Sequence, residues 1–262
     1  MISYWQDLTS TELAAQVHER LVAVMVLGAI EQHGPHLPLS TDLDIGQGLL
    51  AAALARLAED VDVIVLPPLV ISASEEHLSF PGSLSIGGDT AARQVIAAAE
   101  GLERVRIQRL VLLNSHGGNI GWMEQAALEI RRRLGLLVVK VNYMQMPPPV
   151  AVLSARELAC GLHGGQAETA MMLHLHPDKV RRDRLGDFPS SADPDSLLGP
   201  TGPASYAWLA EDLNSAGVTG NAGAATAEQG KRLVDHYATL LARVLHEAAA
   251  FKKSGGGNAQ QA

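Results

Sequence analysis

The stretch LVAVMVLGAIEQHGPHLPLSTDLD, residues 21–44, joins an apolar run to a polar segment that ends in two aspartates. The apolar run at 21–27 is typical of a strand buried on both faces of a sheet, because no polar residue interrupts it. The polar segment contains Glu31, His33, His36, Asp42 and Asp44. A turn needs few of these side chains, so their concentration at the end of one strand indicates a chemical role.

The rest of the chain alternates between short apolar runs and longer helical patterns. Further strands are predicted at 61–66, 110–113 and 136–141, and helices at 45–58, 90–105, 120–134 and 225–251. Asp42 or Asp44 is expected to be the N-cap of the helix at 45–58. Strands that alternate with helices through short connections form a parallel sheet covered on both faces. The fold class predicted is α/β, a three-layer α/β/α sandwich with a largely parallel central sheet.

We expect one domain over residues 1–251, with a long surface loop at 187–203, and a flexible C-terminal tail at 252–262. Of the 262 residues, 47% are hydrophobic and 18% are charged, which is the composition of a folded globular chain. The net charge of −8 argues against nucleic acid or an anionic membrane as a partner. With one cysteine, no signal-peptide pattern and no membrane-spanning stretch, a cytoplasmic location is expected.

Three polar clusters carry the functional prediction. The first contains Glu31, His33 and Asp42, the second is NSHGGN at 114–119, and the third is HGGQAET at 163–169. The first two follow predicted strands, where ligands of open parallel sheets bind. Carboxylates and imidazoles together favour a divalent metal such as Zn²⁺ or Mn²⁺, and a pair of ions removes the repulsion between neighbouring carboxylates. Asp44 is expected to be only a cap or a solvated charge, and the role of His36 stays open.

At these residues the chain resembles the creatininase (creatinine amidohydrolase) family. The matching motifs are ExHGxHLPxxxD at 31–42, NxHGGN at 114–119 and HGGxxET at 163–169, with further agreement at 77–85 and 217–220. The resemblance implies an α/β/α fold and a metal-dependent hydrolase that acts on non-peptide or small amide bonds. It also implies a homo-oligomer, with a hexamer favoured.

The resemblance also implies roles for individual residues. Glu31 and His116 would bind one of two metal ions, His33 would bind the other, and Asp42 would bridge them. His163 would be the catalytic histidine. Creatininase has a glutamate ligand where this chain has Gly118. Glu168 is therefore expected to replace that glutamate on the second ion, either as a ligand or as a residue that contacts a ligand. The expected cofactors are two divalent ions per chain, Zn²⁺ and/or Mn²⁺, with Fe²⁺ as a further candidate.

The predicted mechanism uses a hydroxide that bridges the two ions as the nucleophile and His163 as the proton donor to the leaving amine. The pocket wall is expected from 74–80, 143–153 and 155–162. The segment before His163 has none of the tryptophans with which creatininase closes its site, so a small, uncharged or weakly charged amide is expected as substrate rather than creatinine.

Other functions stay open. These are a creatininase-like peptidase, a formamide hydrolase, and a non-catalytic, metal-stabilised assembly or regulatory subunit. A cysteine hydrolase using Cys160 is less favoured, because a lone cysteine more often serves packing. No dinucleotide fingerprint or phosphate-binding loop is present.

Overall fold

The computed structural model describes residues 1–194 and 196–252, and most of the tail expected at 252–262 lies outside the described residues. A five-stranded sheet forms the centre of the molecule in the order β1-β3-β2-β4-β5. Every neighbouring pair in it is parallel. The strands are β1 (Ile2–Tyr4), β2 (Val22–Leu27), β3 (Val63–Val65), β4 (Arg109–Asn114) and β5 (Leu137–Asn142).

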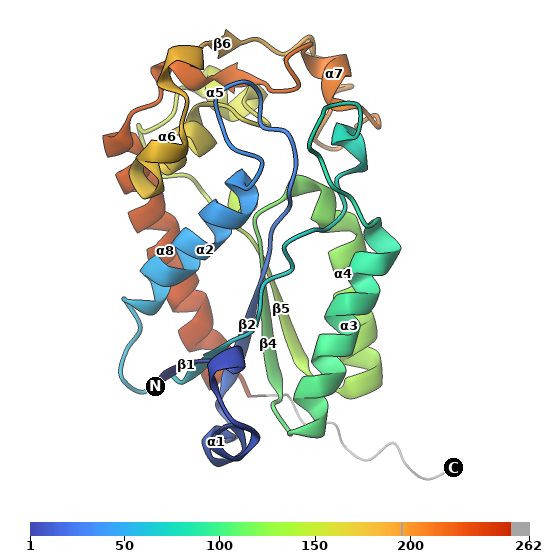
Figure 1. Cartoon of the computed structure of the whole chain (residues 1–262), viewed down its shortest axis with the longest axis vertical. Helices are drawn as coiled ribbons and strands as arrows, with labels where there is room; N and C mark the ends of the chain where they lie inside the picture. The colour runs from blue at the N-terminus through green and yellow to red at the C-terminus, as the bar shows by residue number, and fades with distance from the viewer. Residues whose placement is uncertain (195, 253–262) are drawn as a thin grey trace.

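Helices cover both faces of this sheet (Figure 1). On one side lie α2 (Thr41–Leu54), α6 (Gln166–Leu175) and α8 (Ala227–Ala250), and on the other lie α3 (Gly88–Arg104) and α4 (Ile120–Leu134). The predicted three-layer α/β/α sandwich with a parallel sheet is therefore confirmed.

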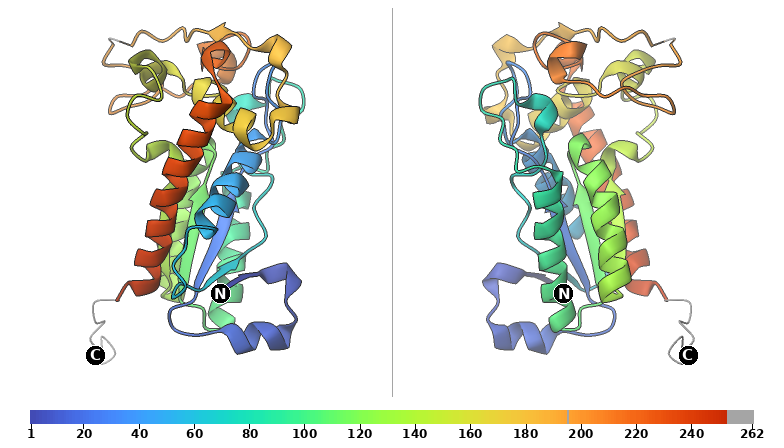
Figure 2. Two further views of the ribbon diagram at one scale, coloured as in Figure 1. Left: turned by 90° about the vertical axis from the view of Figure 1, so that its left-hand side faces the viewer. Right: turned by 90° about the vertical axis from the view of Figure 1, so that its right-hand side faces the viewer.

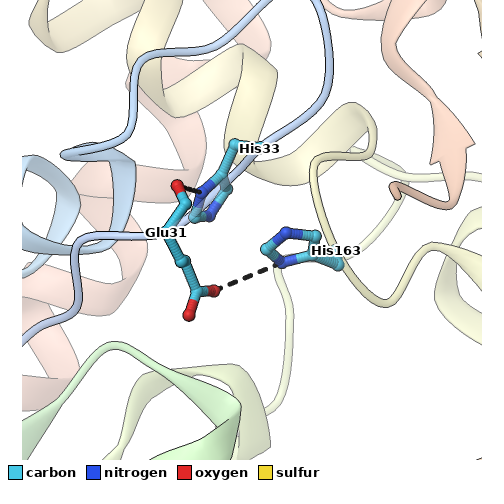
Figure 3. A group of neighbouring side chains, drawn as sticks. All are labelled: Glu31, His33 and His163. Atoms are coloured by element: carbon cyan, nitrogen blue, oxygen red, sulfur yellow. Dashed lines mark hydrogen bonds and ion pairs between the residues drawn. The ribbon is translucent and has the colours of Figure 1, made fainter. Parts of the chain in front are cut away.

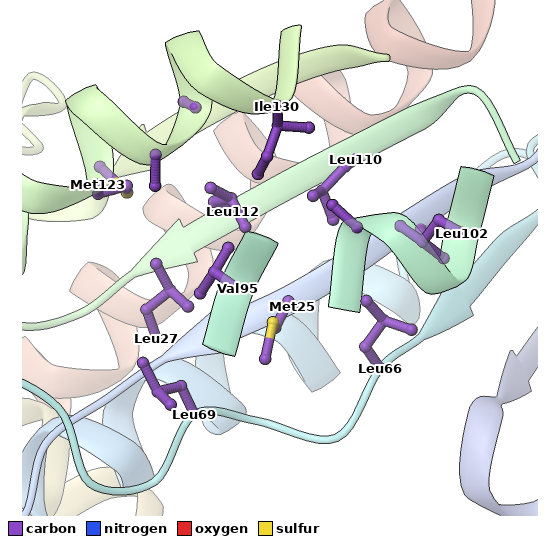
Figure 4. Close-up of a cluster of buried hydrophobic side chains, with 14 of the residues drawn as sticks. Met25, Leu27, Leu66, Leu69, Val95, Leu102, Leu110, Leu112, Met123 and Ile130 are labelled. Atoms are coloured by element: carbon purple, nitrogen blue, oxygen red, sulfur yellow. The ribbon is translucent and has the colours of Figure 1, made fainter. Parts of the chain in front are cut away.

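Strand β2 shows why both faces must be covered. Ala23, Met25 and Leu27 belong to the core under α3 and α4, which Figure 4 shows, while Val22, Val24 and Val26 face α2 and α8. Successive residues of a strand point to opposite faces, so an unbroken apolar run buries one side chain on each in turn.

The carboxyl ends of the strands face a cap of short elements (Figures 1 and 2). The cap contains α5 (Ala155–Cys160), α7 (Ala210–Leu213) and an antiparallel pair of β6 (Asp187–Phe188) and β7 (Gly220–Asn221). The surface loop predicted at 187–203 therefore begins with a strand. At the opposite end lies α1 (Ser10–Gln16), which was not predicted although Thr9 and Glu12 form a capping box before it.

The prediction for the N-terminus of α2 is wrong. The helix begins at Thr41 with Ser40 as its N-cap residue, so Asp42 and Asp44 lie in its first turn. The Ser40 carbonyl already accepts the first helical hydrogen bond, from the Asp44 N–H at 2.8 Å. Asp44 is also not a solvated charge: it is buried and pairs with Lys179 Nζ at 2.8 Å. In the described part of the chain, no helix has an apolar stretch long enough to span a bilayer.

Candidate metal centre

Four elements bring the predicted site residues into one buried cluster at the carboxyl end of the sheet. The loop after β2 supplies Glu31 and His33, and the loop after β4 supplies His116. The first turn of α2 supplies Asp42, and the third sequence cluster, at the start of α6, supplies the rest. The ligand atoms fall into three overlapping groups, each within 4.8 Å, that include all six predicted residues: Glu31, His33 and His163; Glu31, Asp42 and His116; and His33, Asp42 and Glu168. We name these six residues the acid–histidine cluster.

Asp42 lies between two imidazoles of this cluster. Its Oδ1 atom is 3.2 Å from His33 Nε2, and its Oδ2 atom is 3.1 Å from His116 Nδ1. The other nitrogen of each ring donates to a backbone carbonyl, His33 Nδ1 to Glu31 at 3.1 Å and His116 Nε2 to Ala73 at 2.7 Å. A histidine that donates in this way turns its remaining nitrogen toward a metal. Both rings therefore aim a ligand atom at one carboxylate.

Glu31 supplies buried oxygens that lack a hydrogen-bond donor. Both carboxylate oxygens are buried, and neither accepts a hydrogen bond from any residue in the described ranges. Oε1 lies within ion-pair distance of His116 Nδ1 (3.1 Å), His77 Nε2 (3.3 Å) and His163 Nδ1 (3.8 Å; Figure 3). A buried carboxylate that accepts no hydrogen bond costs several kcal/mol. The N and O donors around it are those that Zn²⁺ or Mn²⁺ prefers, so the residues fit a metal ion.

Burial and neighbouring charges set the protonation of the cluster. Burial by itself lowers the pKa of His33, but the carboxylates of Asp42, Glu168 and Glu31 together outweigh it and raise that pKa to about 9. Burial is the dominant effect at Glu168 and raises the carboxyl pKa to about 7. Burial, with His33 and His77 nearby, lowers the pKa of His163 well below its usual value. At pH 7 the metal-free cluster thus contains a charged His33 beside a neutral His163.

The second motif holds His116 through amide side chains. The His116 N–H donates to Asn114 Oδ1 at 3.2 Å, and Asn114 Nδ2 donates back to the His116 carbonyl at 2.8 Å. Asn119 Nδ2 donates to the same Asn114 Oδ1 at 3.1 Å. These contacts explain the two asparagines of NSHGGN as supports for the imidazole.

His77 and Glu76 also belong to the site, although the sequence placed them only in a predicted wall segment, 74–80, and not beside the ligands. The His77 ring stacks on His163 with centroids 4.3 Å apart. Glu76 Oε1 lies 3.7 Å from His116 Nε2, on the outer side of that ring. A Cβ at Gly118 would come within 2.6 Å of this oxygen and 2.5 Å of His116 Nε2, so the space at 118 is already filled. The signal available was the HLSFPGSLS segment that begins at His77.

His163 lies in a loop fixed from several sides. Its Nε2 atom donates to the Gln32 carbonyl at 2.7 Å, and its carbonyl accepts from the Thr219 N–H at 2.8 Å. The next residue, Gly164, donates its N–H to Glu168 Oε2 at 2.6 Å. Because Nε2 carries the proton, the Nδ1 lone pair is directed toward the cluster.

His36 and Cys160 lie outside the cluster. His36 Nε2 donates to the Gly164 carbonyl at 2.9 Å, and burial lowers the pKa of this ring to about 4. His36 therefore supports the His163 loop. Cys160 lines a cavity of about 720 Å³ that contains none of the six cluster residues, which disfavours a cysteine nucleophile.

A second cavity, of about 510 Å³, reaches Glu168. Two of the predicted wall segments, 143–153 and 155–162, contribute to its lining. The third, 74–80, does not line it and instead carries Glu76 and His77 to the cluster.

Comparison with known proteins agrees with this geometry. The Creatininase profile, described as creatinine amidohydrolase, matches residues 6–245. A mycofactocin precursor peptide peptidase from Mycolicibacterium smegmatis is 32% identical over 232 residues, covering 85% of this chain and 84% of the relative. Creatinine amidohydrolase from Pseudomonas putida is also 32% identical, over 216 residues, covering 76% of this chain and 81% of the relative. A manganese form of creatininase superposes with a TM-score of 0.77 at 26% identity, covering 93% of this chain and 97% of that one. The chain belongs to the creatininase family of amidohydrolases.

Proposed function

We propose that this protein is a metal-dependent amidohydrolase with two divalent ions per chain. Glu31, Asp42 and His116 would hold one ion, and His33, Asp42 and Glu168 the other. The observation that carries the proposal is the position of Asp42, whose two oxygens each face a different imidazole nitrogen. Zn²⁺ and Mn²⁺ are the favoured ions, because the donors are imidazole nitrogens and carboxylate oxygens.

Bound ions would lower the pKa of a water molecule and polarise the amide carbonyl. The chain itself supplies the proton transfer. His163 is neutral at pH 7 because burial lowers its pKa, so it takes up a proton before it delivers one to the leaving amine. Its Nδ1 atom faces Glu31 Oε1 at 3.8 Å, and the Nε2 contact with the Gln32 carbonyl fixes the ring.

The proposed substrate is a small amide without strong charge, and creatinine is not favoured. The lining of the 510 Å³ cavity contains no tryptophan and no basic side chain, and all of its residues lie in the described ranges. A peptide-like substrate is the second candidate, and the 32% identity to the mycofactocin precursor peptide peptidase supports it.

We further infer a cytoplasmic homo-oligomer, with a hexamer favoured by the family resemblance. Light scattering after size-exclusion chromatography measures the oligomeric state directly.

A substrate screen tests the function. The protein, supplied with Mn²⁺ or Zn²⁺, is assayed against linear amides, lactams, formamides, short peptides and creatinine. Hydrolysis of an uncharged amide with negligible turnover of creatinine is expected. If creatinine were the best substrate, the proposal about substrate class would be wrong. Two bound ions without turnover of any compound would instead favour a metal-stabilised assembly or regulatory subunit.

A further inference from the structure

We propose that the 510 Å³ cavity beside Glu168 binds an extended apolar substituent of the amide, so that the preferred substrates carry an alkyl or aryl group next to the scissile bond. This inference rests on the proposed function, because it takes the acid–histidine cluster as the reacting centre. Glu168 connects the two, since it both belongs to a candidate metal group and lines the cavity. The cavity therefore begins at a residue of the reacting centre, where a substituent of a bound amide can reach it.

The lining of the cavity is mostly apolar. Methionine side chains at 144, 146 and 171 and leucine side chains at 153, 158 and 162 line it, together with two tyrosines and two prolines. Tyr143 and Tyr237 pack edge to face with ring centroids 5.5 Å apart. Methionine adapts to ligands of different shape, and aromatic walls favour flat or apolar groups. Such walls favour a flexible hydrocarbon chain or a ring.

The charges of the cavity disfavour an anionic substituent. No lysine, arginine or histidine occurs among its lining residues, all of which are described. Its two acids are Glu168 and Glu157, and Glu157 is already satisfied: it accepts from the N–H groups of Gln166 at 2.6 Å and Asn221 at 2.9 Å. A phosphate or carboxylate would find no cation, and Glu168 is directed toward His33.

The size of the cavity and its rim fit the same ligand. A volume of about 510 Å³ lies within the range of small-molecule sites and far exceeds what the amide group alone would fill. Leu158 and Met144, which line it, are 55% and 37% exposed. Exposed apolar side chains at the mouth of a cavity that reaches the reacting centre are covered when an apolar group enters.

Alkyl hydroxamates test this proposal without knowledge of the substrate, because the hydroxamate group chelates metal ions and the tail reports on the cavity. Calorimetry on the Mn²⁺- or Zn²⁺-loaded protein compares aceto-, butyro-, hexano- and heptanohydroxamate. Affinity is expected to rise about three- to fourfold per added methylene. The control ligand, 6-aminohexanohydroxamate, has as many heavy atoms as heptanohydroxamate but a cationic end, and is expected to bind at least tenfold more weakly.

A matched pair of variants locates the tail. Leu158→Asp places a charge on the cavity wall, and Ala155→Asp places the same charge on the same short helix at an exposed position that does not line the cavity. Leu158→Asp should reduce the ratio of heptano- to acetohydroxamate affinity at least tenfold, while Ala155→Asp preserves it. Affinity that is independent of tail length, or a length dependence that survives Leu158→Asp, would overturn the proposal. Failure of every hydroxamate to bind, with no metal retained, would overturn the proposed function and this inference with it.

Discussion

Asp42 is the side chain on which the proposed pair of ions depends, because it alone in the cluster faces both His33 and His116 at 3.1–3.2 Å. We predict that Asp42→Asn, which keeps the shape but removes the charge, loses both ions or nearly both. The wild type should carry about two ions per chain by elemental analysis.

Asp44→Asn is the matched control for this substitution. Asp44 lies two residues further along the same helix, is also buried, and pairs with Lys179 rather than with the cluster. The Asp44→Asn variant should retain both ions even if it is less stable than the wild type. Equal metal content in Asp42→Asn and the wild type would remove the basis for a bridging carboxylate.

His163 should matter for turnover and not for metal content. His163→Gln removes the titrating Nδ1 atom, so kcat should fall about 10²- to 10⁴-fold, the usual contribution of a general acid or base. Elemental analysis should still find two ions, since the other five cluster residues stay in place. The exposed His174 offers a control, because His174→Gln changes the same residue type away from the cluster. If His163→Gln lost metal instead of turnover, His163 would be a ligand.

The protonation of the cluster predicts how metal binding depends on pH. In the metal-free chain the pKa of His33 is raised to about 9, and that of His116 is also raised, because Glu31 and Asp42 outweigh the effect of burial. Protons on these nitrogens must leave before a cation binds. Metal affinity should therefore increase from pH 6 to pH 9, with release of protons. Calorimetry in buffers of different ionisation enthalpy measures the number of protons released per ion bound. A value of zero at pH 7 would contradict these protonation states.

At the scale of elements, Glu157 joins α5 to the loop that carries His163. Its carboxylate accepts from the first N–H of α6, at Gln166, and from Asn221 in β7. A Cβ at Gly161, Gly165 or Gly220 would collide with this carboxylate, so both the 161–165 loop and β7 leave room for it. Charge-assisted hydrogen bonds to backbone N–H groups are strong contacts, and the one from Gln166 lies at the positive end of the α6 dipole. Glu157 thus fixes the position of the His163 loop from behind.

We predict that Glu157→Gln lowers kcat about 10-fold to 100-fold with little change in KM or in metal content. The amide presents an N–H group to one of the two donors, so the loop shifts, and small displacements of a catalytic group are costly. Ser154→Ala is the control: Ser154 Oγ caps α5 by accepting from the Glu157 N–H at 3.1 Å, so its loss weakens the same helix without touching the carboxylate. Equal losses of kcat in both variants would mean that the stability of α5, and not the carboxylate, is responsible.

The sequence predicts elements well where burial is continuous and poorly where support comes from distant segments. The run at 21–27 and the helix at 120–134 are observed within one residue of their predicted bounds, because apolar pattern and glycine at 135 define them locally. The start of α2 is missed by four residues, since contacts with Lys179 and with the acid–histidine cluster, and not helix propensity, place the acids in its first turn. Glu76 and His77 are missed because their role depends on the loop after β3 folding back to His116.

At the scale of the whole molecule, the parallel sheet determines where the carboxylates of the acid–histidine cluster lie. All five strands of the described sheet point the same way, so the loops after β2 and β4 end at one edge, and the cap closes over them (Figure 1). This arrangement places the carboxylates of Glu31, Asp42 and Glu168 together in a buried volume. Each is supplied by a different segment, so the repulsion among them acts between segments that folding must bring together.

Removal of metal should therefore destabilise the entire fold. An ion that binds the native state alone stabilises it by about 2.7 kcal/mol when present at a hundred times its dissociation constant. For a chain of this length each such ion corresponds to a rise in Tm of about 5–10 °C, so two ions per chain raise it by about 10–20 °C. We predict a fall of this size when a chelator strips the wild type, with elemental analysis to show that the ions are gone. Asp42→Asn, which should bind no metal ions, is expected to show the same Tm with and without chelator. A stripped wild type that melts at the temperature of the loaded protein would show that the buried acids of the cluster do not depend on a cation for their place in the fold.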